Sequence, residues 1–155
     1  MRKFHGRELW GGLRQSIIDA IKELGAMRAE SASGPIAELL DCRFDVKWEG
    51  EAEDSYPAIG ALVTIGEHAI PSIVDAIASR DRSDRFIESA EQTIWRIQGR
   101  KTASMVPVFQ AALEKYKAKG LVKGSHRLEV VLDSLANALW KDGTPPATAP
   151  RARAP

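Results

Sequence analysis

The stretch YPAIGALVTIGEHAIPSIVDAIAS, residues 56–79, decides the fold. Its apolar residues recur at spacings of three and four on both sides of a Gly66-Glu67-His68 turn, which predicts two short helices with one apolar face each. Gly66 follows the first helix, where a left-handed C-cap favours glycine. Pro71 lies in the first turn of the second helix, where its missing N–H costs nothing. The predicted apolar faces consist of Ile59, Leu62 and Val63, then Ile70, Ile73, Val74 and Ile77.

Amphipathic helices are predicted on both sides of this stretch. They cover residues 9–24, a segment opening at Pro35, and residues 83–98, 103–118 and 125–141. The apolar face of the first helix consists of Trp10, Leu13, Ile17, Ile21 and Leu24. Ser83 and Ser125 are placed to cap two of the later helices. Trp95 lies off the apolar stripe of its helix; we expect a neighbouring repeat to cover it, and a binding hot spot is the alternative.

Residues 41–54, DCRFDVKWEGEAED, interrupt the helical pattern. Phe44, Val46 and Trp48 alternate there with charged residues, and this period of two indicates an extended segment. We expect the three apolar side chains to hold this connection against the edge of the helical array. The alternative is a strand or loop that binds a partner.

An internal repeat links the helices. Pro35, Pro71 and Pro107 lie 36 residues apart by subtraction (71 − 35 and 107 − 71), each at the beginning of a helix after a glycine-containing turn. The positions that follow each proline also correspond if the first copy is shifted by one residue: Ile36, Ile73 and Phe109; Leu39, Ala76 and Ala112; and Leu40, Ile77 and Leu113. Self-similarity at this period indicates stacked helical hairpins, which are stable only when neighbouring copies cover one another.

Residues 61–99, ALVTIGEHAIPSIVDAIASRDRSDRFIESAEQTIWRIQG, carry a recognisable pattern. Ile65-Gly66 ends one helix, Ala69-Ile70-Pro71 opens the next, and the turn from Asp81 to Arg85 leads onward. This pattern resembles prokaryotic HEAT-like repeats, and the resemblance extends over residues 56–114. It implies a scaffold with a surface for a protein partner; minorities of such proteins bind DNA as alkylpurine glycosylases or act as phycobilin lyases. Armadillo-like or tetratricopeptide-like hairpins remain alternative labels.

Composition restricts the class of protein. The chain has 155 residues, a mass of 17.0 kDa and a formal net charge of +1, which fits one globular domain without general attraction to nucleic acid or anionic lipid. Cys42 is the single cysteine, which excludes an intrachain disulfide and suits a reducing compartment. The uncharged run AIGALVTIG is too short to span a bilayer. We therefore expect a cytoplasmic protein outside the membrane.

Motifs for chemistry are missing from the sequence. His5, His68 and His126 are scattered, with no pair at metal-ligand spacing, and Cys42 has no histidine partner. Phosphate-binding glycine loops and the GxSxG motif are likewise missing. The sequence therefore predicts no catalysis, no metal, no cofactor and no small-molecule substrate.

Charge is distributed unevenly along the chain. Residues 38–54 are acidic, whereas the second half carries many basic side chains. The basic residues around the later turns are Arg82, Arg85, Arg96, Arg100 and Lys101. They define the alternative function, binding of nucleic acid or another polyanion, although no aromatic side chains are interleaved among them.

Together these observations predict an all-α protein. We expect a short HEAT-like superhelix of about three helical hairpins plus a terminal helix over residues 7–141, and a disordered Pro/Ala/Arg-rich tail over residues 142–155. We expect a non-enzymatic scaffold or adaptor whose partner is a protein. The predicted contact surfaces are the exposed face of the second helix of each hairpin, including Asp75, and the segment with Phe44, Val46 and Trp48.

Overall fold

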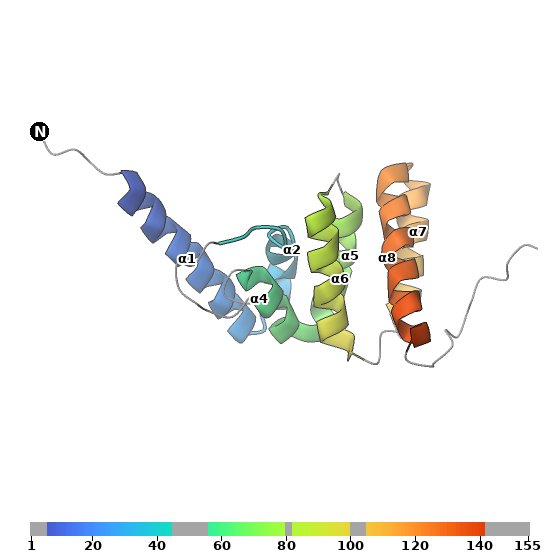
Figure 1. Ribbon diagram of the computed structural model, residues 1–155, viewed down its shortest axis with the longest axis horizontal. Helices are drawn as coiled ribbons and strands as arrows, with labels where there is room; N and C mark the ends of the chain where they lie inside the picture. The colour runs from blue at the N-terminus through green and yellow to red at the C-terminus, as the bar shows by residue number, and fades with distance from the viewer. Residues whose placement is uncertain (1–5, 45–55, 80–81, 100–104, 142–155) are drawn as a thin grey trace, which may run out of the picture. The chain divides into compact units, whose positions relative to one another are not determined.

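The computed structural model describes residues 6–44, 56–79, 82–99 and 105–141. These residues are predominantly helical, with no strand among them, so the all-α prediction is confirmed (Figure 1). The predicted disordered tail, 142–155, lies outside the described residues. The chain divides into two compact units, residues 1–73 and 74–155, and the boundary falls within α5 (Ile70–Ser79).

The first unit is built on a close helix pair. It contains α1 (Gly6–Ala26), η1 (Glu30–Ala32), α2 (Ser33–Ala37), α4 (Pro57–Ile65) and η2 (Gly66–Ala69). Both α1 and α2 pack against α4. The contact between α1 and α4 depends on Gly25, because a Cβ atom there would lie 2.7 Å from the Cα of Ala61. The two helix axes approach closely at this point because neither residue has a large side chain.

The buried face of α1 differs from the predicted one. Ile18 and Ile21 are buried, whereas Leu13 is 56% and Ile17 39% exposed. The apolar arc of α1 is wider than the strip that α4 covers. Periodicity alone therefore does not show which part of the arc is buried, and the predicted face was displaced toward Leu13 and Ile17. The prediction that Leu13 and Ile17 are buried is therefore wrong.

The stretch 56–79 folds largely as its pattern predicts. Gly66 ends α4 with a positive φ of 82°, and its N–H donates to the carbonyl of Leu62. Pro71 is the second residue of α5. By length and composition Pro57–Ser79 as a whole is long and apolar enough to cross a membrane, but 56% of its most apolar part is buried within the protein. Core helices of proteins pass the same test.

The second unit contains the later part of α5 together with α6 (Asp84–Gln98), α7 (Val106–Ala118) and α8 (Val122–Lys141). In Figure 1, α6 and α8 run in the same direction, and α7 and α8 form an antiparallel pair. α8 packs against both α7 and α6. Gly124 brings α8 against α5, since a Cβ atom at this position would clash with the backbone of Ala78. Phe86 and Phe109 are fully buried in this unit.

The two predicted caps have different outcomes. Ser83 caps α6, because its hydroxyl accepts a hydrogen bond from the N–H of Phe86 at 3.1 Å. The prediction for Ser125 is wrong, because α8 begins at Val122. Ser125 lies inside the first turns, and its hydroxyl donates back to the carbonyl of Leu121. Gly120, with a φ of 69°, makes the turn before α8, so the helix begins sooner than the Gly124-Ser125 pair suggested.

Most of the matched repeat positions are buried, whereas Leu39 and Leu113 are half-buried. Pro35, Pro71 and Pro107 each lie within the first three residues of a helix. The residues matched to Ile73, namely Ile36 and Phe109, are buried, as Ile73 is. α2 is shorter than predicted: it ends at Ala37 and continues as a turn, with the N–H of Leu39 bonded to the carbonyl of Ile36.

Candidate protein-interaction surface

Asp75 joins two helices of the second unit. Its Oδ1 accepts hydrogen bonds from the hydroxyl of Tyr116 at 2.8 Å and from Nζ of Lys115 at 2.9 Å. The ammonium groups of Lys115 and Lys119 also lie 5.1 and 5.6 Å from the centroid of the Tyr116 ring. Desolvation, and then the bond to Asp75, raise the pKa of Tyr116 to about 12. Asp75, a predicted contact residue, thus connects α5 to α7.

Arg82 fastens the end of α5 to the beginning of α6. Its Nε donates to the carbonyl of Ala76 at 3.0 Å, and its guanidinium carbon lies 4.3 Å from the centroid of the Phe86 ring. An arginine held by both a carbonyl and a ring is ordered by its own chain. The same carbonyl, in the last turn of α5, also accepts a hydrogen bond from the Ser79 hydroxyl at 3.3 Å.

The other predicted contact residues are only partly described. Arg85 is exposed and Arg96 half-buried on α6, and their spacing of 11 places them about 16 Å apart along the helix. Phe44 is half-buried, with the guanidinium of Arg14 5.9 Å from its ring. Four residues lie outside the described part of the chain: Val46, Trp48, Arg100 and Lys101.

Two large apolar side chains are exposed on neighbouring helices of the second unit. Trp95 on α6 is 53% exposed and Val130 on α8 is 48% exposed. Between these helices the hydroxyl of Ser134 donates to Oε2 of Glu91 at 3.4 Å. Because α6 and α8 run in the same direction, Trp95 lies one turn beyond this bond and Val130 one turn before it, so the two apolar side chains flank the bond on opposite sides. We name this surface the Trp95 face: Ile87, Glu88, Glu91 and Trp95 of α6 with Val130, Asp133 and Ser134 of α8.

The Trp95 face carries carboxylates between and beside its two apolar side chains. Glu88 and Asp133 are exposed, and Glu91 is half-buried. Burial raises the pKa of Glu91, the hydrogen bond from Ser134 opposes this effect, and the charge of Glu88 adds to it. Burial and the charge of Glu88 thus both disfavour the ionised carboxylate, and a cation placed beside it would stabilise that form.

Sequence pattern identifies only one of the two apolar residues. Trp95 lies off the apolar stripe, but the prediction that a neighbouring repeat covers it is wrong, since half of the side chain remains exposed. Val130 is not part of the predicted apolar face of its helix, because it lies beside the buried Leu128 and Val131 and not in line with them.

A shallow depression at the turn between α7 and α8 is a weaker candidate. Its volume is about 330 Å³, and Val122, which is 77% exposed, lies at its rim. Nζ of Lys117 lies 2.9 Å from Oε1 of Glu129, and Nδ1 of His126 lies 3.9 Å from Oε2 of the same residue. Ser125 also lines it, but its hydroxyl is bonded to the Leu121 carbonyl. These side chains satisfy one another and leave no activated nucleophile.

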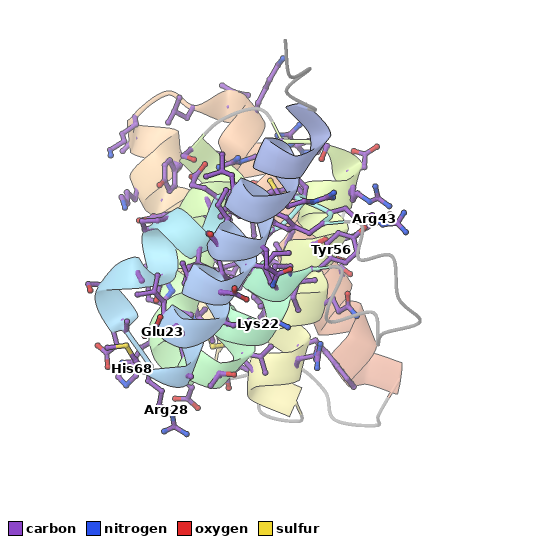
Figure 2. The ribbon with its side chains drawn as sticks, turned by 90° about the vertical axis from the view of Figure 1, so that its left-hand side faces the viewer. Lys22, Glu23, Arg28, Arg43, Tyr56 and His68 are labelled. Carbon is purple, nitrogen blue, oxygen red and sulfur yellow. The ribbon has the colours of Figure 1, made fainter. Side chains whose placement is uncertain are left out.

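Metal-binding and nucleophilic chemistry find little support among the described residues. No group of three or more His, Cys, Asp or Glu side chains there is placed to hold a metal ion. Burial, and then the charge of Asp41, raise the pKa of the Cys42 thiol, which disfavours the reactive thiolate. His68 belongs to η2 and is exposed. Figure 2 shows it in the same region as Glu23 and Arg28, near the C-terminal end of α1. Its Nε2 lies 3.5 Å from Oε1 of Glu30.

Comparison with known proteins gives no relative. No family model matches the chain, no curated protein matches it, and no solved structure matches it.

Proposed function

We propose that this protein is a HEAT-like helical-repeat scaffold that binds a protein partner through the Trp95 face. The observation that carries the proposal is the exposure of Trp95 and Val130 on two helices joined by the Glu91–Ser134 hydrogen bond. Tryptophan is enriched among the residues that dominate binding energy at protein interfaces. Half-exposed large apolar side chains flanked by polar ones are typical of such surfaces.

The repeat part of the proposal has separate support. The three prolines 36 residues apart by subtraction (71 − 35 and 107 − 71) each lie near the beginning of a helix, and the matched positions Ile36, Ile73 and Phe109 are buried. Stacked helical hairpins leave long helix faces at the surface, and such proteins use these faces to bind partners. Binding of nucleic acid or another polyanion has less support. One of the basic residues predicted for it, Arg82, is bonded within its own chain.

Site-specific photo-crosslinking in the native host tests the proposal. A photoreactive amino acid replaces Gln92, which is exposed on α6 one turn from Trp95. The matched control carries the same group at Gln110, which is exposed on α7. We expect a discrete protein adduct from position 92, identified by mass spectrometry, and loss of this adduct when Trp95→Ala is added.

The control position also separates the two predicted surfaces. Gln110 lies on the second helix of a predicted hairpin, so an adduct at position 110 without one at position 92 would move the binding site to that helix. An adduct at position 92 that survives Trp95→Ala would contradict the assignment of the Trp95 face. Circular dichroism of the variant excludes unfolding as the cause of a lost adduct.

A further inference from the structure

We infer that the Trp95 face takes a basic amphipathic helix of its partner, with apolar side chains on Trp95 and Val130 and Lys or Arg side chains on the surrounding carboxylates. This inference rests on the proposed function and names the chemistry of the partner. It joins three observations: two exposed apolar side chains, three carboxylates around them, and a face made only of helix surface.

Charge complementarity selects a basic partner. The carboxylates of Glu88, Glu91 and Asp133 lie on the same face as the two apolar side chains. The basic residues Lys123 and Arg127 share the side of α8 that carries Val130, but they lie two turns and one turn before it, whereas Asp133 follows it. A partner cation placed near Glu91 would offset, by its attraction, the desolvation of this carboxylate and its repulsion from Glu88. An acidic partner, including a nucleic acid, would increase that repulsion.

The helical surface selects a helical partner. Extended peptides bind by adding hydrogen bonds to an exposed sheet edge, and backbone groups in the middle of α6 and α8 are already bonded within their helices. Ile87, Glu91 and Trp95 instead form a row with a spacing of four residues, and Val130 and Ser134 form a second row. Rows of this spacing pack against the corresponding rows of another helix.

Peptide binding to a single-tryptophan variant tests the inference. Trp10→Phe, Trp48→Phe and Trp140→Phe leave Trp95 as the only indole of the full chain. Three synthetic amphipathic peptides of about 18 residues, long enough for several helical turns, share one leucine face and carry Lys, Gln or Glu at all other positions. We expect the Lys peptide to shift the Trp95 emission to the blue and to bind at least tenfold more tightly than the Gln peptide at low salt. The Glu peptide should be the weakest.

Charge variants show whether the Trp95 face causes this order. The triple variant Glu88→Gln, Glu91→Gln, Asp133→Asn should bring the Lys and Gln peptides to equal affinity. The matched control Asp19→Asn, Glu23→Gln, Glu67→Gln removes three exposed carboxylates of the first unit and should keep the tenfold preference.

Each contrary outcome has a defined meaning. Equal binding of all three peptides would overturn the basic partner and leave the Trp95 face as an apolar contact surface. A preference for Lys that survives the triple variant, or the failure of any peptide to shift the emission, would also overturn the inference. The proposed function would still be decided by the crosslinking at position 92.

Discussion

Tyr116 lies in an environment that strongly disfavours its ionised form, because burial and Asp75 raise its pKa to about 12. Its hydroxyl donates to Asp75, and Lys115 shares the same carboxylate oxygen. The sequence places these residues 40 and 41 positions apart, so no local pattern connects them. Charge and amphipathicity identify Asp75 as polar and on a helix, but only the packing of α7 near α5 shows which groups it meets.

A pH titration of Tyr116 follows from this arrangement. A tyrosine whose pKa rises on folding contributes stability that is complete below its ordinary pKa, about 10, and is lost as the pH rises toward about 12. In a Tyr56→Phe background, we expect tyrosinate absorbance to appear with a midpoint near pH 12. Asp75→Asn should lower that midpoint, because the charge and the hydrogen bond that favour the neutral phenol are weakened.

The stability of a Tyr116→Phe variant checks the same contact at neutral pH. Loss of a hydrogen bond to a charged group is expected to cost about 1 to 2 kcal/mol in the free energy of unfolding. Chemical denaturation at pH 7 measures this loss. An unchanged stability would show that water replaces the phenol at Asp75.

Close helix approaches at glycine decide how the elements pack. Gly124→Ala should destabilise the protein by about 1 to 3 kcal/mol, since the added methyl group clashes with the backbone of Ala78. Gly60→Ala is the matched control: nothing lies within 4 Å of its added Cβ, and alanine in the middle of α4 should stabilise by up to about 1 kcal/mol. Thermal and chemical denaturation of both variants measure the difference. A Gly124→Ala variant that is as stable as the unaltered protein, or more stable, would contradict the assigned packing of α8 against α5.

Helix positions could be predicted better than helix faces. The beginning of α6 follows from Ser83 and a regular apolar period, and the structure confirms it. The buried face of α1 could not be predicted, because its apolar arc is wider than one neighbouring helix covers and the pattern does not show which part remains exposed. The same ambiguity affects the candidate site. The position of Trp95 off the apolar stripe of α6 is the same whether a neighbouring helix or a binding partner covers it.

At the scale of the whole molecule, the distribution of charge separates two functions. The net charge is +1, Arg82 is bonded to its own chain, and the Trp95 face is acidic. We expect a labelled DNA duplex to show no anisotropy change with this protein even at low ionic strength, where phosphate contacts are strongest. Binding that weakens steeply with added salt would favour the polyanion-binding alternative, and Arg85→Ala with Arg96→Ala would then locate it.

Much of the whole-molecule prediction depended on repetition. The apolar period predicted the helices and the proline spacing predicted their succession. The all-α class is confirmed. Partner choice depends instead on a few surface side chains, such as Trp95 and Val130, that the repeat does not constrain. Two chains with the same buried positions can therefore present different surfaces, which is why the fold was easier to predict than the binding site.

The contact made by Arg82 has a consequence for genetics. In a screen for loss of function, a substitution at this position would be interpreted as the loss of a positive charge from a binding patch. Its guanidinium, however, bonds the carbonyl of Ala76 and covers the ring of Phe86. Lysine keeps the charge but has neither the Nε–H nor the planar surface. An allelic series at this codon would therefore follow side-chain geometry rather than charge, and the defect would appear as low protein abundance.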